Sequence, residues 1–139
     1  MAGRSAKEIL NEFYEKEYHY LSPDGGDFSI MADLIHPDCI MHQADSLPFG
    51  GEWKGVDGLK AWLEAFDRTF SSVQLLETEQ FDCGLVVITK IKMVAVSRNS
   101  GKSFPLDCFQ YVRAEDDRLI EFRPFYWDTA QILEACAQQ

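Results

Sequence analysis

An acidic side chain among aromatic ones is the first feature of this sequence that could do chemistry. Two strand-like runs, Ser103 to Arg113 and Arg118 to Tyr126, flank a polar turn. In the first run, alternation puts Asp107, Phe109 and Tyr111 on one face and Leu106, Cys108 and Gln110 on the other. A carboxyl group among in-facing aromatic rings should have a raised pKa, which suits a catalytic or ligand-orienting acid. The alternative is a structural acid bound to the backbone or to Arg123.

A histidine that could remove a proton near neutral pH lies on an earlier strand, Cys39 to Asp45. His42 is either this general base or a structural histidine at a strand edge whose ring nitrogens have hydrogen-bond partners. A shift of one residue in the strand would turn its side chain outward. Asp45 is a less favoured base.

Asp128 can be interpreted in two ways. With Gln131 it forms the pattern of a helix cap, which lowers the pKa of a carboxyl group and is the favoured interpretation. The other interpretation is an acid/base residue at the start of the last helix.

Aromatic residues are plentiful, with ten Phe, five Tyr and three Trp. We expect several of them to line a pocket for substrate, although plain core is the alternative. The candidates are Phe49, Trp53, Phe109, Phe122 and Tyr126.

Hydrophobic periodicity indicates the elements that must position these residues. Helices are expected at Ser5 to Leu21, Asp27 to Ile35, Val56 or Asp57 to Phe70, and Asp128 to Ala137. Further strands are expected at Val73 to Phe81 and Leu85 to Ser97. The loop Leu47 to Gly55 is rich in glycine but lacks the ending of a phosphate-binding loop. This order predicts one α+β domain over residues 1–139, with helices on one face of a curved antiparallel sheet.

Composition excludes several classes of function. The net charge of −10, with 23 acidic and 13 basic residues, argues against nucleic-acid binding and favours a neutral or apolar ligand. No apolar run reaches transmembrane length, and the N-terminus lacks a signal-peptide core. The four cysteines show no metal-ligand spacing, so we expect free thiols, no metal site and a cytoplasmic location. Lys90 and Lys92 are expected on the outer face of the sheet.

Three segments together resemble a known superfamily. They are Ala32 to His42, Leu47 to Gly55, and Leu106 to Tyr111 with Arg118 to Arg123. Their order is similar to that in the nuclear transport factor two-like superfamily, which includes SnoaL-like polyketide cyclases and ketosteroid isomerases. The resemblance implies a cone-shaped curved sheet wrapped around N-terminal helices, a short C-terminal helix and a deep apolar pocket. It also implies a homodimer formed through the outer face of the sheet.

The resemblance also implies roles for individual residues. Asp107 matches the oxyanion-hole aspartate of the isomerases, a carboxylic acid that apolar surroundings keep protonated so that it can donate a hydrogen bond. Tyr14 or Tyr18 matches their helix-one tyrosine donor, and Asp128 matches the acid/base residue of the cyclases. The sequence departs from the isomerases at His42 to Asp45. In the isomerases an aspartate that acts as general base is followed by proline at this place, and this chain lacks that pair. The difference argues against a steroid isomerase proper.

The leading hypothesis is a small cofactor-independent acid/base enzyme of the isomerase, cyclase or dehydratase type. It would act on a neutral hydrophobic substrate by proton transfer next to a carbonyl, or by dehydration. An epoxide hydrolase is less favoured. The competing hypothesis is a non-catalytic module of the same fold that binds a small molecule or serves dimerisation.

Overall fold

The computed structural model describes residues 3–137 and contains four helices and seven strands. The helices are α1 (Ala6–Tyr20), α2 (Ser29–Ala32), α3 (Gly55–Thr69) and α4 (Thr129–Cys136). The strands are β1 (Ile35–Gln43), β2 (Gly51–Lys54), β3 (Phe70–Cys83), β4 (Val86–Ser97), β5 (Ser103–Pro105), β6 (Cys108–Glu115) and β7 (Arg118–Tyr126). This architecture confirms the predicted α+β class with a curved sheet and a short C-terminal helix.

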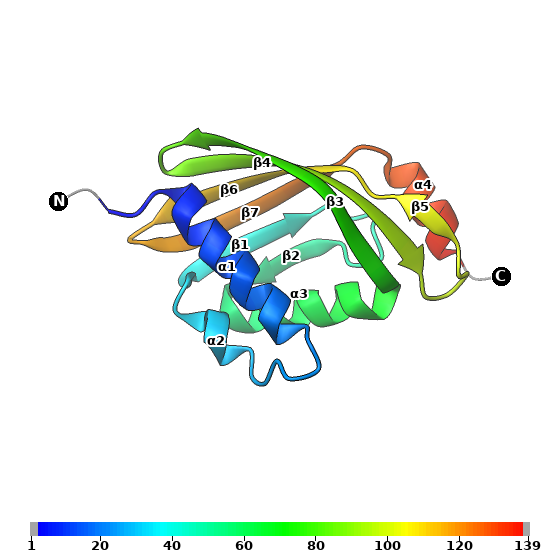
Figure 1. Ribbon diagram of the computed structural model, residues 1–139, viewed down its shortest axis with the longest axis horizontal. Coiled ribbons are helices and arrows are strands. Elements are labelled where there is room, and N and C mark those ends of the chain that lie inside the picture. Colours follow the sequence, from blue (N-terminus) through cyan, green and yellow to red (C-terminus); the bar gives the residue numbers. More distant parts are fainter. Residues whose placement is uncertain (1–2, 138–139) are drawn as a thin grey trace.

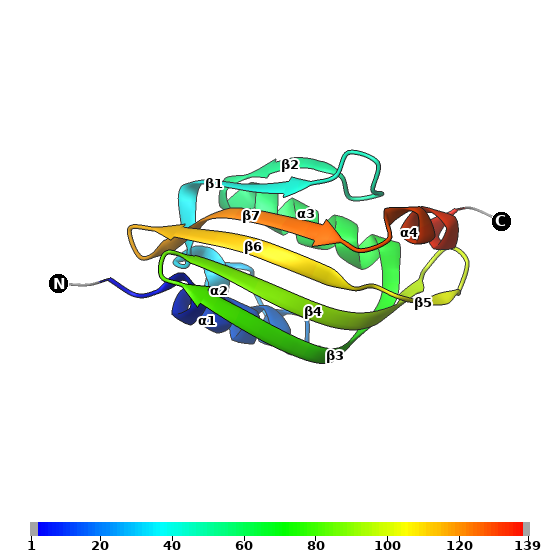
Figure 2. The same cartoon turned by 90° about the horizontal axis from the view of Figure 1, so that it is seen from above.

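The strands form one sheet in the order β2-β1-β7-β6-β4-β3, and β5 pairs with β4. β1 runs parallel to β7, and the other neighbours are antiparallel. The sheet curves over α1, α2 and α3 (Figure 1). Seen from above, these helices lie behind the sheet, and α4 lies at its end (Figure 2). We call the side that faces α1 and α3 the inner face, and the opposite side the outer face.

Local chemistry explains where the elements begin and turn. Ser5 caps the N-terminus of α1, and its Oγ accepts a hydrogen bond from the Glu8 backbone N–H at 3.2 Å in a capping box. β6 and β7 are joined through Asp116 and Asp117, which have φ angles of 54° and 60°. Two consecutive left-handed residues form the turn that matches the twist of a tight hairpin, and aspartate tolerates this conformation better than most residues.

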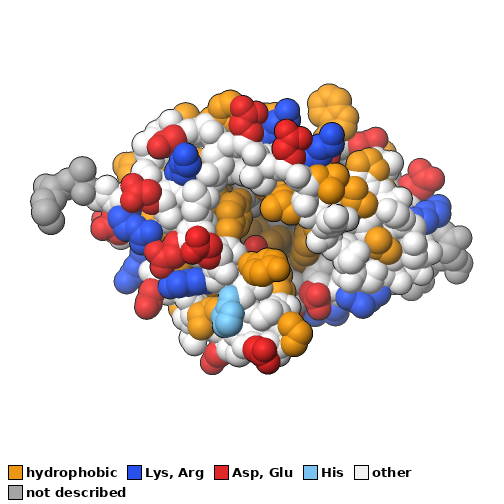
Figure 3. Space-filling view, in the orientation of Figure 1, with side chains coloured by type: hydrophobic (Ala, Val, Ile, Leu, Met, Phe, Trp, Pro, Cys, Tyr) orange, Lys and Arg blue, Asp and Glu red, His pale blue; other side chains and the backbone are white. Residues whose placement is uncertain are grey.

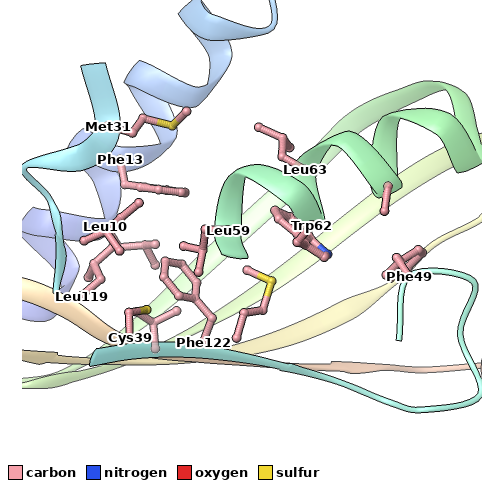
Figure 4. Packing of buried hydrophobic residues seen from close by; sticks show 14 of the residues in the cluster. Leu10, Phe13, Met31, Cys39, Phe49, Leu59, Trp62, Leu63, Leu119 and Phe122 are labelled. Carbon is pink, nitrogen blue, oxygen red and sulfur yellow. The ribbon is translucent and has the colours of Figure 1, made fainter. Parts of the chain in front are cut away.

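The hydrophobic core lies between the inner face and the helices (Figure 4). Phe13 of α1 packs on Phe122 of β7 with ring centroids 5.4 Å apart. Farther along the sheet, Phe49 contacts the rings of Phe66, Phe70 and Tyr126 edge-on. Tilted and edge-on pairs of this kind add to the stabilisation from area burial alone.

Three of the predicted elements need correction. The second helix is only Ser29–Ala32, because β1 already begins at Ile35. Part of the glycine-rich loop forms β2, which pairs with β1 from Ile40 opposite Lys54 to Gln43 opposite Gly51. The run predicted from Ser103 to Arg113 is divided between β5 and β6.

Candidate active site

The strand pairing decides which side chains face the interior. On β6, Cys108 and Val112 are buried on the inner face, while Phe109 is 49% exposed. The predicted alternation is therefore confirmed, but the prediction that Asp107 and Phe109 face inward is wrong. On β6 the inner positions therefore carry Cys108, Gln110 and Val112, and the outer positions carry Phe109 and Tyr111.

Asp107 lies in a row of residues across the outer face. Glu77 of β3 pairs with Lys92 of β4, and the register continues to Asp107 and then to Trp127. The Asp107 backbone oxygen accepts a hydrogen bond from the Trp127 N–H at 2.9 Å. Its buried Oδ1 atom has no hydrogen-bond partner among residues 3–137.

This row forms one wall of an outer groove with a volume of about 540 Å³. The groove is lined by Glu77, Glu79, Lys90, Ile91, Lys92, Asp107, Cys108, Phe109, Phe125, Tyr126 and Trp127. Phe125 and Trp127 are 60% and 85% exposed, so the groove is an open surface feature and not the enclosed pocket that the sequence predicted.

His42 also points outward. Its Nδ1 atom lies 3.2 Å from Glu52 Oε2, on the neighbouring strand β2. The inner positions of the same strand are taken by the buried Met41 and Gln43. The structure therefore favours the strand-edge interpretation of His42, because it does not bring His42 to the interior.

Two further candidates lie outside the interior. Tyr18 is 82% exposed, so Tyr14 is the α1 tyrosine that faces the sheet. Asp128 is exposed and caps α4, where its Oδ1 accepts a hydrogen bond from the Gln131 N–H at 3.0 Å. This contact confirms the capping interpretation of Asp128.

A row of polar side chains crosses the inner face. The register aligns Gln80 of β3, Thr89 of β4 and Gln110 of β6. Gln80 Nε2 donates to Asn11 Oδ1 of α1 at 2.9 Å, and the Tyr14 hydroxyl donates to Gln110 Oε1. These bonds fix the helix over the sheet and leave a polar strip within an otherwise apolar interior.

Glu17 of α1 is the acidic group in this interior. Burial raises its pKa from 4.5 to about 7, since the charged form loses its hydration. Its charge in turn contributes to the raised pKa of Tyr14, after the larger effect of burial on that phenol. A carboxyl group with a pKa near 7 can both accept and release a proton under neutral conditions.

The sequence contained a signal for Glu17 that was not used. Glu17 follows Phe13 by four residues and Tyr14 by three, so it continues the apolar stripe of α1. A charged residue on the buried side of an amphipathic helix is unusual and indicates a paired or functional group.

Tyr126 of β7 is a second phenol on the inner side of the sheet, paired in register with Cys108 of β6. Burial raises its phenol pKa well above the usual value, and the adjacent Gln43 amide offsets only part of this effect. Cys108, opposite Tyr126 on β6, lies near both tyrosines, and burial raises its thiol pKa to about 12. Both phenols and the thiol therefore remain protonated and can act only as neutral groups near pH 7.

Of the predicted lining residues, Phe49 and Phe122 are fully buried core. Trp53 is half-buried, and its Nε1–H donates to the Phe49 carbonyl at 3.0 Å. Tyr126 is the one that borders the polar strip, whereas Phe109 belongs to the outer groove.

An inner hollow opens beside these groups. Figure 3 shows it on the face where α1 lies, below β3, with mainly hydrophobic walls and an acidic side chain inside. Val73 and Leu75 of β3 pair with Ala95 and Met93, so they point to the inner face, yet they are 36% and 59% exposed. We call this opening the inner hollow. Tyr14, Glu17, Gln110 and Tyr126 are polar groups on the same, inner side of the fold.

Comparison with solved structures shows a nuclear transport factor two-like fold. An NTF2-like protein from Burkholderia xenovorans is 16% identical with a TM-score of 0.85, and the match covers 99% of each chain. A candidate SnoaL-like polyketide cyclase from Jannaschia is 11% identical with a TM-score of 0.77, covering 96% of this chain and 93% of that one. At these identities the likeness establishes the fold and not the activity.

A third structure gives the same result. A hypothetical protein with a ketosteroid isomerase-like fold from Catenulispora acidiphila, in complex with trimethylamine, is 11% identical with a TM-score of 0.71. The match covers 97% of this chain and 96% of that chain.

The SnoaL-like domain model matches residues 13–122, and the chain therefore belongs to the SnoaL-like domain family. This confirms the resemblance seen in the sequence. No curated protein matches the chain. No helix within residues 3–137 is long and apolar enough to span a membrane.

Proposed function

We propose that the protein is an acid/base enzyme that binds a neutral hydrophobic molecule in the inner hollow and moves a proton next to a carbonyl group. The observation that carries the proposal is the position of Glu17, a half-buried carboxyl group one helical turn from Tyr14 on the side of α1 that faces the sheet, where burial raises its pKa to about 7. The isomerase, cyclase and dehydratase reactions all require this step. None of these residues needs a cofactor for it.

Each group has a defined role in this proposal. Glu17 in its ionised form removes the proton from carbon and then returns it to a second position. Tyr14 turns its hydroxyl from Gln110 to the carbonyl oxygen as negative charge develops there, and Tyr126 is a second donor. The surrounding rings exclude water, so these hydrogen bonds are stronger than they would be in solution.

A simple ketone tests the proposal without knowledge of the natural substrate. 2-Tetralone in D₂O exchanges its acidic C–H hydrogens, and NMR measures the rate. We expect the protein to accelerate this exchange and Glu17→Gln to lower the acceleration about a hundredfold, as is typical for loss of a general base. The acceleration should increase up to a pH of about 7 and then level off, because only ionised Glu17 is active.

Equal exchange rates with the wild-type protein and Glu17→Gln would contradict the enzyme and favour a non-catalytic binding module. One observation supports that second candidate. Asp107 and His42, the acid and base that the sequence predicted, both lie on the outer face and cannot act in the inner hollow.

We propose separately that two copies associate through the outer groove. Phe109, Phe125 and Trp127 expose large aromatic surfaces there, which is typical of an interaction site. Acidic residues of β3 lie beside basic residues of the adjacent strand β4 in the groove, with Glu79 paired in register with Lys90. A twofold axis can place the acidic row of one copy against the basic row of the other, so the surface is complementary to itself.

A further inference from the structure

Thr89 is a deeply buried polar residue of β4 that the proposed function does not use. It is only 1% exposed. Its side chain lies on the inner face, in register between Gln80 of β3 and Gln110 of β6. A buried hydroxyl group is costly unless it is hydrogen-bonded, so its partners show what it does.

The oxygen of Thr89 accepts a hydrogen bond from β3. Gln80 Nε2 lies 3.3 Å from Thr89 Oγ1 and 2.9 Å from Asn11 Oδ1 of α1. An amide nitrogen carries two protons and accepts no hydrogen bond, so Gln80 donates one proton to each oxygen. The single proton of the Thr89 hydroxyl group is therefore left for another acceptor.

That acceptor is the hydroxyl oxygen of Tyr14. The Tyr14 hydroxyl group donates to Gln110 Oε1, and Gln110 is paired in register with Thr89 on the next strand. Side chains in directly opposite positions have Cβ atoms about 5 Å apart, so Thr89 lies beside the Tyr14 hydroxyl group. Burial raises the pKa of the Tyr14 phenol, and a hydrogen bond with Thr89 offsets part of this increase. A hydrogen bond lowers the pKa of a phenol when the phenol oxygen accepts it, so Thr89 is the donor.

These contacts form a hydrogen-bond series with one direction. Gln80 donates to Thr89, and Thr89 donates to Tyr14. Tyr14 in turn donates to Gln110 Oε1, an amide oxygen that only accepts. Hydrogen bonds in such a series polarise one another, so the last hydroxyl group becomes a stronger donor.

Building on the proposed function, we infer that Thr89 is a positioning residue that keeps the proton of Tyr14 available for the carbonyl oxygen of the ligand. Thr89 directs its own proton at the Tyr14 oxygen, so the Tyr14 proton points away from Thr89. When a ligand binds, Tyr14 exchanges Gln110 for the carbonyl oxygen and retains the hydrogen bond from Thr89. Thr89 itself acts only through Tyr14.

The hydrogen bond from Thr89 can be tested without a substrate. Tyrosine labelled with ¹³C at Cζ gives a separate NMR signal for each tyrosine, and Tyr14→Phe identifies the signal of Tyr14. We expect Thr89→Val to shift this signal and to leave the signals of the other tyrosines unchanged. Thr89→Ser, which keeps the hydroxyl group, should retain the wild-type signal. Thr69→Val is the matched control and should not shift it, because the Thr69 hydroxyl group donates to the Ala65 carbonyl in α3.

The exchange of 2-tetralone tests the positioning role. Thr89→Val should lower the rate at saturating ketone about fivefold, the effect of one hydrogen bond of ordinary strength, and should change KM little. This effect should be absent in a Tyr14→Phe background, because the two residues act as one unit. The pH dependence of the rate should stay as in the wild-type protein, since it belongs to Glu17.

An unchanged Tyr14 signal in Thr89→Val would overturn the inference, whether or not the protein is an enzyme. A shifted signal with a wild-type exchange rate would overturn the positioning role and leave the proposed function intact. A shifted signal in a protein whose wild-type form does not accelerate exchange would support the hydrogen-bond series and reject the enzyme. If Thr89→Val does not fold by circular dichroism, Gln80→Met decides, because it removes the first donor of the series and should shift the same signal.

Discussion

Glu17 is the residue whose environment says most about function. Its pKa is about 7 in the folded protein against 4.5 as the reference value. Between these values the unfolded chain releases a proton that the folded protein retains. The contribution of Glu17 to the free energy of unfolding therefore falls as pH rises from 4.5 to 7 and is constant above that range.

This pH dependence gives a prediction about stability. Between pH 4.5 and 7, the unfolding free energy of the wild-type protein should decrease by up to about 3 kcal/mol more than that of Glu17→Gln, as measured by urea denaturation. The figure is an upper limit because the side chain keeps some contact with solvent. Parallel curves for the two proteins over this range would show that Glu17 titrates normally and would remove the basis for its catalytic role.

Asp107 provides the opposite case, an acid without a role in the inner hollow. Asp107→Asn should leave 2-tetralone exchange within about twofold of wild type, because the residue lies on the outer face. A hundredfold loss of exchange, of the size expected for a missing oxyanion donor, would show that the outer groove and not the inner hollow is the reaction site.

At the scale of elements, most of the fold was predictable from patterning, and the facing of one hairpin was not. The stripe of α1 and the alternation of β6 were both visible in the sequence. However, β6 carries Phe109 and Tyr111 on one side and Cys108 and Gln110 on the other. Hydrophobicity alone favours the aromatic side as inner, whereas the strand pairing places Cys108 and Gln110 on the inner side, together with Phe122 and Tyr126 of β7.

The site was harder to predict for the same reason. The candidates Asp107 and His42 depend on strand facing, and a wrong face moves both out of the interior. Tyr14 and Glu17 depend on helical spacing, which is readable from sequence, but nothing in the sequence shows that α1 lies over Gln110. β2 was missed because its residues, Gly51 to Lys54, resemble a loop in composition.

The capping of α4 allows a test at this scale. Asp128→Ala should lower the free energy of unfolding by about 1 kcal/mol, the usual effect of losing an N-cap, as measured by thermal or urea denaturation. The same variant should leave 2-tetralone exchange unchanged. Exchange that falls while stability is retained would restore the acid/base interpretation that the family resemblance suggested for Asp128.

At the scale of the whole molecule, helices pack on one face of the sheet, and the outer groove exposes three aromatic side chains that a monomer would leave in water. Burying apolar surface is favourable by about 25 cal/mol per Å², so association of two copies should be favourable. We expect a sedimentation mass of twice the 15.9 kDa chain.

Phe125→Glu should convert the dimer to a monomer, since it places a charge in the apolar centre of the interface. Tyr18→Glu is the control and should leave the dimer intact, because Tyr18 is an exposed residue of α1 outside the outer groove. A wild-type monomer at tens of micromolar, or a dimer that Phe125→Glu leaves intact, would show that the outer groove serves another partner.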